Sequence, residues 1–362
     1  MTEMAFDREK LAAAQQLFEE GINRQLYPGG AMLVSQKNVV VMQVCEGHTS
    51  FMREKRVDEN TLFDLASLTK PIATAPAVLL LSQKGSISLD QSVTEFFPER
   101  NLPHLENVTL RHLLTHSSGL PPWRALYSDG HTREQAIDEL FTIEPEYEPG
   151  TVYAYSCLGY ILLGLVIEKA SGESLDRFAR RHLFEPMDMP NTLFSPAMIR
   201  GPHKYAFAAT DHSQTRDRML NGEVHDDNAF ALGGAAGNAG LFSNIQDLAA
   251  FCRRITIQEQ SCENIPLNNA VLKLMFQNAL PDSIGSQSIG WFMKGNNMLP
   301  AGDFVSNFAI GHSGFTGTGI VIDPAYELFV ILLTNRVCLG DDGLEFRKLR
   351  RRVFDAIVGA IV

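Results

Sequence analysis

The two ends of the chain carry the same pattern, two β-rich runs beside one helix, and this pattern restricts the possible folds more than any other feature. Near the N-terminus, "AMLVSQ" and "VVVMQVCEG" are separated by Lys37-Asn38 as in a hairpin, after an amphipathic helix that Asp7 can cap. Near the C-terminus, "TGTGIVIDP" and "ELFVILLTN" precede a helix with apolar residues on one side. These strand pairs predict one antiparallel sheet, built from both chain ends and flanked by the terminal helices.

The middle of the chain, residues 67–285, has the spacing of helices rather than of strands, and Ser243 with Gln246 gives a capping-box pattern before one of them. The sequence therefore predicts an α/β (α+β) fold. In it, residues 1–66 and 286–362 form a sheet domain, and residues 67–285 form an inserted, mainly helical domain. We expect the active site in the cleft between the two domains, because ligands often bind at such interfaces.

Composition and charge exclude several classes of partner. Of the 362 residues, 45% are hydrophobic and 20% are charged, which is ordinary for a soluble globular protein. The net charge of −11 makes nucleic acids and anionic membrane surfaces poor partners. No apolar run approaches the roughly 18–20 residues of a membrane span. The sequence gives no indication of the oligomeric state.

The cysteines and the N-terminal segment bear on the compartment. The five cysteines are scattered and contain no C-x-x-C: Cys45, Cys157, Cys252, Cys262 and Cys338. This pattern argues against a disulfide framework and a zinc site, and it fits a reducing compartment. The first residues lack the basic start and apolar core of a secretion signal. We therefore expect a cytoplasmic location, or a periplasmic one if a leader has been removed.

Two polar or glycine-rich segments raise the question of a bound metal or cofactor. In "EVHDDNA" (Glu223–Ala229), His225, Asp226 and Asp227 are plausible metal ligands, but a polar loop beside the cleft is the favoured interpretation. The segment "GGAAGNAG" (Gly233–Gly240) lacks the spacing and the preceding strand of a dinucleotide site, and indicates a close-packed loop. We expect neither a metal nor a cofactor.

The segment "LFDLASLTKP" places Ser67 and Lys70 three residues apart at the predicted start of a helix. Residues at this spacing share a helix face, so the amine can reach the hydroxyl, and the Ser67 N–H in the first turn has no intrahelical partner. With ten lysines and 22 serines in the chain, chance alone gives about 0.6 such pairs. The pair alone therefore does not distinguish a nucleophile from a capping serine beside a lysine.

Two later segments add to this pair. In "EPGTVYAYSCLGYILLGLVI", a turn leads into a helix and leaves Tyr155 on the entering loop, where an aromatic residue at the core edge is the simpler alternative. In "GHSGFTGTG", the glycines that follow His312 permit the close approach of another backbone or of an extended substrate.

The three segments in this order resemble the serine β-lactamase and penicillin-binding protein superfamily, and most closely its branch of class C β-lactamases, DD-peptidases and family VIII carboxylesterases. Further segments share the resemblance, which covers most of residues 30–340: "LRHLLTHSSGLPPW", "LFEPMDM", "GLFSNIQDLAAF" and "LLTNRV". The resemblance implies a β-lactamase/transpeptidase-like fold.

The resemblance also implies a role for each matching residue. Ser67 would be the acylated nucleophile, and Lys70 and Tyr155 would together exchange its proton. The backbone N–H groups of Ser67 and Phe315 would form the oxyanion hole. The substrate-binding strand would contain His312, Ser313 and Gly314. For the amine of Lys70 to act as a base near pH 7, its pKa must fall by about three from about 10.4, which corresponds to about 4 kcal/mol. Burial of the amine could supply part of this free energy, and a nearby tyrosinate could share the role of the base.

The sequence departs from the family pattern at two positions. Cys157 occupies a place that usually holds Asn or Asp, and a thiol is a weak hydrogen-bonding group for a substrate amide. His312 occupies the place of a lysine in most β-lactamases, and a largely neutral imidazole binds a carboxylate less well. Arg336, in "TNRV", is a candidate for the missing charge. Trp291 is a candidate wall of the acyl pocket, with simple core packing as an equal alternative.

These features predict a two-step serine acyl hydrolase, most simply a carboxylesterase on short acyl esters with weak β-lactam turnover. The alternative is a D-Ala-D-Ala carboxypeptidase, D-aminopeptidase or penicillin-binding protein. A third class, a non-catalytic sensor or scaffold, rests on Cys157. The expected partner is a small-molecule ester, amide or β-lactam.

Overall fold

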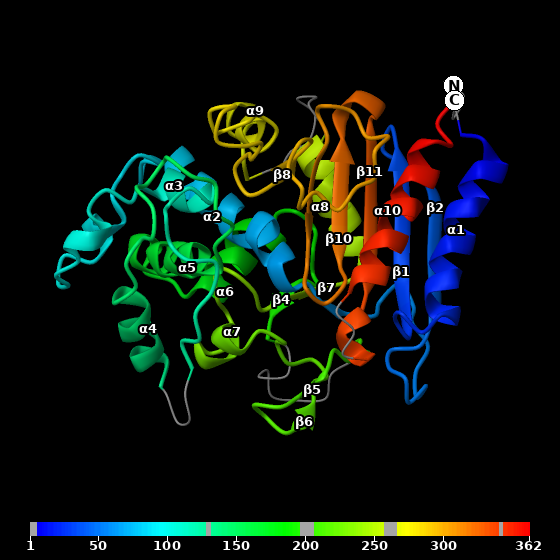
Figure 1. Ribbon diagram of the computed structural model, residues 1–362, viewed down its shortest axis with the longest axis horizontal. Helices are drawn as coiled ribbons and strands as arrows, with labels where there is room; N and C mark the ends of the chain where they lie inside the picture. The colour runs from blue at the N-terminus through cyan, green and yellow to red at the C-terminus, as the bar shows by residue number, and fades with distance from the viewer. Residues whose placement is uncertain (1–5, 128–131, 196–205, 257–265, 340–342) are drawn as a thin grey trace.

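The computed structural model describes residues 6–127, 132–195, 206–256, 266–339 and 343–362. Its main sheet has six antiparallel strands in the order β2-β1-β11-β10-β9-β8 (Figure 1). These strands are β1 (Gly29–Gln36), β2 (Val39–Gly47), β8 (Phe292–Met293), β9 (Ile310–Ser313), β10 (Gly319–Asp323) and β11 (Leu328–Thr334). The first strand pairs directly with the last, so the prediction of one sheet from both chain ends is confirmed.

Two terminal helices lie side by side on one face of this sheet, α1 (Arg8–Asn23) and α10 (Leu344–Val358) (Figure 1). Asp7 caps α1, as predicted, because its carboxylate accepts hydrogen bonds from the N–H groups of the first turn. Phe18 of α1 and Phe354 of α10 are fully buried in the core that the two helices form with the sheet.

The other face of the sheet is covered by α8 (Ile245–Thr256) and by the helical part of the chain. Along β11, Val330 and Leu332 belong to the core under the terminal helices, whereas Ile331 and Leu333 belong to the core on the α8 side. A strand buried on both faces needs apolar residues at successive positions, and this explains the unbroken run "LFVILL".

The remaining elements are mostly helices around a central one, α5 (Cys157–Ser171), which is buried from Leu158 to Ile167. The other α-helices are α2 (Ala75–Gln83), α3 (Leu110–Leu114), α4 (Arg133–Phe141), α6 (Leu175–Ala179), α7 (Asp227–Ala231) and α9 (Asn269–Leu272). Shorter helical turns are η1 (Ala66–Leu68), η2 (Lys70–Thr74), η3 (Val93–Phe96), η4 (Pro103–Leu105), η5 (Arg180–Phe184), η7 (Lys273–Met275), η8 (Pro324–Tyr326) and η9 (Arg336–Leu339). One small sheet contains β3 (Phe63–Asp64), β4 (Leu193–Phe194) and β7 (Leu241–Ser243). Another contains β5 (His212–Ser213) and β6 (Arg218–Met219).

The predicted cap of α8 is wrong by one residue. Asn244, not Ser243, caps this helix, because its side chain accepts the N–H of Asp247. Ser243 instead lies in β7, where its hydroxyl pairs with that of Thr192 at 2.7 Å. Pairing with a distant strand thus decides the role of a residue whose local pattern indicates a cap.

Two further features concern the thiols and the lengths of the helices. Cys45, Cys157, Cys252 and Cys338 are free thiols, and Cys262 lies outside the described residues. In the ranges that the structure describes, no helix combines the length and the apolar character needed to cross a membrane.

Candidate active site

Ser67 lies in the tight turn that joins β3 to the helix containing Lys70. The preceding residue, Ala66, has φ +46°, a left-handed conformation that is uncommon for a residue with a Cβ. Its N–H donates to Oδ1 of buried Asp64 at 2.8 Å, which holds the turn. The Ser67 side chain is half-buried, whereas Lys70 has no exposed surface. The turn therefore presents the hydroxyl outward and keeps the amine in the interior.

Lys70 is the centre of the site. Its Nζ lies 3.0 Å from Ser67 Oγ, 3.5 Å from Cys157 Sγ and 3.0 Å from the carbonyl oxygen of Asn238. Burial lowers the pKa of Lys70, and the nearby Cys157 and Asp226 oppose this effect. The structure thus brings the predicted serine and lysine into contact, and the lowered pKa favours the amine that a base requires.

Tyr155 completes the group. The amine of Lys70 lies 5.1 Å from the centre of its ring, and its hydroxyl interacts with that of Ser67. Burial raises the pKa of Tyr155 well above its usual value, and Cys157 adds to this effect. The phenol is therefore neutral near pH 7, and burial is what lowers the pKa of the lysine.

His116 supports Tyr155 and was not identified from the sequence. Its Nδ1 accepts the N–H of Ser156 at 3.1 Å, its carbonyl oxygen accepts the N–H of Ala154 at 2.8 Å, and its ring lies 4.4 Å from that of Tyr155. Burial, followed by the proximity of Lys70, lowers the pKa of His116 well below its usual value. The imidazole is therefore neutral, with its proton on Nε2. The only signal in the sequence was its place in the segment "LRHLLTHSSGL".

The strand β9 brings the third predicted segment to the site. His312 is buried and stacks on Phe292, with 4.2 Å between ring centres. Burial lowers its pKa well below the usual value, so the ring carries no charge near pH 7. Ser313 is half-buried, and Gly314 packs so closely that a Cβ there would overlap the carbonyl oxygen of Leu65.

Two threonines tie this segment to the backbone before Ser67. Thr316 donates to the carbonyl oxygen of Asp64 at 2.7 Å, and Thr318 donates to that of Leu65 at 3.1 Å. Within the described parts of the chain, the N–H groups of Ser67 and Phe315 donate to no protein acceptor. Both groups are therefore available for a developing oxyanion.

Arg336 and Trp291 are not placed as the sequence suggested. Arg336 is only 7% exposed, and its guanidinium lies 4.8 Å from the centre of the exposed Phe315 ring. It packs against the aromatic residue instead of presenting an open charge to the site. Trp291 has no exposed surface and stacks on Phe251 of α8, so it is a core residue and not the wall of a substrate pocket.

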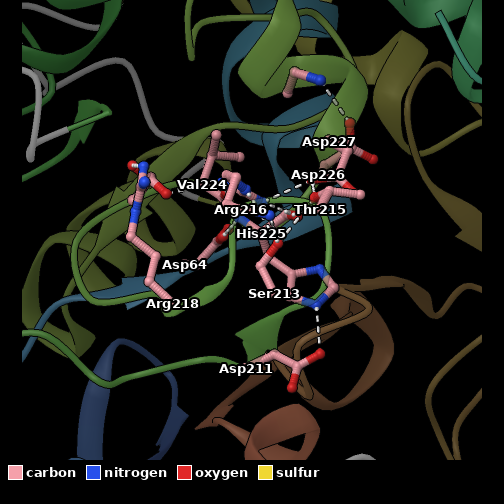
Figure 2. Close-up of polar contacts among 12 residues, drawn as sticks. Asp64, Asp211, Ser213, Thr215, Arg216, Arg218, Val224, His225, Asp226 and Asp227 are labelled. Carbon is pink, nitrogen blue, oxygen red and sulfur yellow. Dashed lines mark hydrogen bonds and ion pairs between the residues drawn. The ribbon is translucent and has the colours of Figure 1, made fainter. Parts of the chain in front are cut away.

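The polar segment around His225 is held by a set of hydrogen bonds and ion pairs that includes Asp64 and Arg216 (Figure 2). The N–H of His225 donates to Asp64 Oδ2 at 2.7 Å, and Asp226 Oδ1 accepts a hydrogen bond from Asn238 at 3.3 Å. Among the described residues, no three or more His, Cys, Asp or Glu side chains are arranged to hold a metal ion. The hydrogen bonds of the segment connect it to Asp64 and to Asn238.

The glycine-rich loop that contains Asn238 is closely packed, as predicted. A Cβ at Gly237 would overlap the carbonyl oxygen of Tyr160 in α5, and the Gly237 carbonyl accepts a hydrogen bond from Thr74 at 2.7 Å. This packing brings the Asn238 carbonyl to Lys70. No local pattern indicates that contact, because its two partners are far apart in the chain.

Comparison with known proteins gives one consistent set of relatives. The family model described as Beta-lactamase matches residues 14–352. The chain is 31% identical to the N-acetylmuramyl-L-alanine amidase of Bacillus subtilis, over 91% of this chain and 82% of that protein. It is 28% identical to an Escherichia coli protein named provisionally as a D-alanyl-D-alanine carboxypeptidase, over 86% of this chain and 79% of that protein.

Solved structures give the same fold at lower identity. The hydrolase EstCE1, described as having promiscuous acyltransferase activity, is 22% identical and covers 97% of this chain and 99% of its own, with a TM-score of 0.73. The octameric penicillin-binding protein homologue of Pyrococcus abyssi is 24% identical and covers 90% of this chain and 73% of its own, with a TM-score of 0.72.

Proposed function

Because the chain belongs to the Beta-lactamase family of serine hydrolases, we propose that it hydrolyses short acyl esters through an acyl-enzyme on Ser67. The observation that carries this proposal is the 3.0 Å contact between Ser67 Oγ and the buried amine of Lys70. A serine hydroxyl is a weak nucleophile until a neighbouring base accepts its proton, and burial favours the free-base form of this lysine.

In the first step, Ser67 Oγ attacks the ester carbonyl carbon and its proton passes to Lys70 Nζ. The carbonyl oxygen becomes an oxyanion, which the N–H groups of Ser67 and Phe315 stabilise. When the tetrahedral intermediate collapses, the bond to the alcohol oxygen breaks. Tyr155 passes its proton to the departing alkoxide and is reprotonated by the ammonium of Lys70. The products are the alcohol and the acylated serine, with the amine neutral again.

In the second step, a water molecule attacks the acylated serine and gives its proton to Lys70. The bond between Ser67 Oγ and the acyl carbon breaks, the carboxylic acid leaves, and the proton returns to the serine oxygen. Tyr155 is neutral and lies beside Ser67. It can therefore donate a hydrogen bond to the departing alkoxide in the first step and to the Ser67 oxygen in the second.

The charges around the site support an ester over a substrate with a terminal carboxylate. His312 is neutral, and Arg336 packs behind the ring of Phe315, so neither offers an open cation. Cys157 gives a substrate amide only a weak hydrogen-bonding group. An ester without a carboxylate requires neither interaction.

The second candidate is hydrolysis of an amide, such as a D-Ala-D-Ala peptide. The names of the Bacillus subtilis and Escherichia coli relatives, an amidase and a D-alanyl-D-alanine carboxypeptidase, favour it. A sensor that is acylated but not deacylated is a third candidate, because Cys157 replaces a residue that usually contacts the substrate.

One preparation tested against p-nitrophenyl acyl esters, nitrocefin and a D-Ala-D-Ala peptide separates these candidates. We expect rapid turnover of a short ester, a transient acyl adduct on Ser67 by intact-protein mass spectrometry, and loss of both in Ser67→Ala. A faster reaction with the peptide would favour the second candidate, and a lasting nitrocefin adduct without ester turnover the third. Full ester turnover by Ser67→Ala would overturn the proposal.

A further inference from the structure

The segment from Glu223 to Asp227 is connected to the nucleophile turn through Asp64 and to the catalytic amine through Asn238. Figure 2 shows this segment with Asp64 and Arg216. One contact runs to the nucleophile turn. Asp64, which is 2% exposed, accepts the N–H of Ala66 with one carboxylate oxygen and the N–H of His225 with the other. The carboxylate thus links this segment to the backbone that precedes Ser67.

The second contact runs to the catalytic amine. Asp226 Oδ1 accepts the N–H of Ala229 at 2.7 Å, which caps α7, and the amide N–H of Asn238 at 3.3 Å. The Asn238 carbonyl oxygen in turn accepts a hydrogen bond from Lys70 at 3.0 Å. Asn238 has no exposed surface, so water does not replace these bonds. A single buried residue therefore connects the carboxylate to the amine.

One side chain holds the whole segment. The guanidinium of Arg216, on the β5–β6 hairpin, is 6% exposed. Its five N–H groups are shared among acceptors on the hairpin and on the segment, at distances of 2.7–3.3 Å: Ser213 Oγ, Glu223 Oε1, Asp227 Oδ1 and the carbonyl oxygens of Val224 and His225. Only arginine offers enough donors in a fixed plane to bind all of them, and a lysine has three.

We propose that Arg216 and Asp226 are positioning residues for acyl transfer. Arg216 fixes the segment from Glu223 to Asp227, and Asp226, by binding the side-chain amide of Asn238, holds the backbone carbonyl of Asn238 against the amine of Lys70. This inference rests on the proposed function, because it assigns the two residues to the reaction of Ser67. It adds a charge relationship. The carboxylate of Asp226 is linked to the amine through Asn238, and its negative charge opposes the effect of burial on the pKa of Lys70, so its removal weakens the base.

The titratable groups around the amine come from several segments of the chain. They are Cys157 of α5, Tyr155 before it, Tyr160 within it, His116 after α3, His312 of β9 and Asp226 before α7. Of these, the tyrosines and the histidines are neutral near pH 7, because burial raises the pKa values of the former and lowers those of the latter. Cys157 and Asp226 both oppose the effect of burial on the pKa of Lys70, and Asp226 is the carboxylate of the two.

The test compares three variants on a p-nitrophenyl ester, with active sites titrated by the acylation burst so that unfolded protein does not count. Asp226→Asn keeps the size and one acceptor oxygen but removes the charge. We expect kcat to fall about threefold, because a weaker base is less effective, and the acid limb of the kcat/KM profile to move down by about half a pH unit. We expect little change in KM, since Asp226 does not touch the substrate.

Arg216→Lys should lower kcat by a similar factor, because it keeps the charge but releases most of the acceptors. The matched control is Arg218→Gln, on the same hairpin as Arg216. It breaks only the partly exposed ion pair between Arg218 and Glu223, and it should behave as the wild type. Loss of kcat without any shift of the acid limb in Asp226→Asn would show that its charge does not act on Lys70 and would overturn the inference, as would wild-type kinetics. If Ser67→Ala also stays active, the proposed function fails instead.

Discussion

Gly314 shows how closely two distant segments must approach to form this site. The carbonyl oxygen of Leu65 and the hydroxyl of Thr318 occupy the space that a Cβ on this glycine would need. The glycine therefore sets the distance between the Phe315 backbone and the turn that bears Ser67. A shift here separates the two N–H groups of the proposed oxyanion hole.

We expect Gly314→Ala to lower kcat about 100-fold, because a displacement of this size near reacting atoms has such an effect. Gly319→Ala is the control, since its Cβ would meet no atom closer than 3.9 Å. Ester hydrolysis per titrated active site measures both variants. Equal activity of the two would show that the close approach of Gly314 is not required.

The two buried histidines, His116 and His312, make stability depend on pH. Burial lowers both pKa values in the folded protein, whereas the unfolded chain binds protons near pH 6.5. Below that pH the unfolded state holds more protons, so the free energy of unfolding decreases as the pH falls. Each histidine contributes up to about 1.4 kcal/mol per pH unit below 6.5. The lowered pKa of Lys70 acts in the same direction, and the raised pKa of Asp64 in the opposite one.

Urea unfolding at pH 7.5 and 5.5 tests this prediction. We expect the wild type to lose stability at the lower pH, and His312→Gln to lose less because it lacks one of the two titrating groups. The comparison between the two proteins isolates the histidine contribution from those of Lys70 and Asp64. An identical pH dependence in both proteins would contradict the assignment.

At the level of single residues, the sequence predicted the contact of Ser67 with Lys70 because a helical spacing of three is a local property. It did not predict the contributions of His116, Asn238 or Asp226. His116 and Asn238 act through hydrogen bonds to segments far away in the chain, and Asp226 acts through Asn238; no local pattern encodes such bonds. Trp291 illustrates the same limit, because local composition cannot distinguish a core tryptophan from a pocket wall.

Among the elements, α5 begins directly beside the site, because its first residue, Cys157, contacts Lys70. Ser156 caps it: the hydroxyl accepts the N–H of Gly159 at 3.2 Å and donates to the carbonyl oxygen of Pro121 at 2.8 Å. The same residue follows Tyr155 directly. The cap therefore stabilises the helix and fixes the loop that carries the phenol.

We expect Ser156→Ala to lower the free energy of unfolding by about 1–2 kcal/mol and kcat by about tenfold. Thr132→Ala removes the cap of α4, on the surface and away from the site, and serves as the control. It should cost about 1 kcal/mol without changing kcat. Chemical denaturation and ester hydrolysis on the same samples measure both quantities. If kcat fell equally in the two variants, the loss would reflect general stability.

The larger elements were predictable from the sequence, whereas several small ones were not. Apolar runs with turn residues between them define the strands of the main sheet, and the terminal helices follow from their apolar faces. The two-residue strand β4 carries too little local signal, and it exists because it pairs with β7.

At the scale of the whole molecule, the C-terminal helix α10 is as necessary as any core strand. It buries Phe346, Leu349, Val353, Phe354 and Ile357 against the sheet and α1. Each such side chain contributes about 1.5–3 kcal/mol by burial, so the five together are comparable to the whole stability of a typical protein.

We therefore expect a chain that ends at residue 343 to be unfolded or insoluble. Deletion of Val362 alone, which is 83% exposed, should leave the protein unchanged. Circular dichroism and solubility after expression distinguish the two outcomes. A soluble, active chain without α10 would show that the terminal helices are not part of the essential core.

The pairing of β1 with β11 has a consequence for the order of events during synthesis. The first strand emerges early from the ribosome, but its partner lies near the other end of the chain. Closing the loop between them is slow, as for all contacts between remote residues. Until β11 has been translated, the edge of β1 has no native neighbour and must be shielded from other nascent chains. The sheet is thus completed only after β11 has been translated, and chaperone demand should be greatest just before that moment.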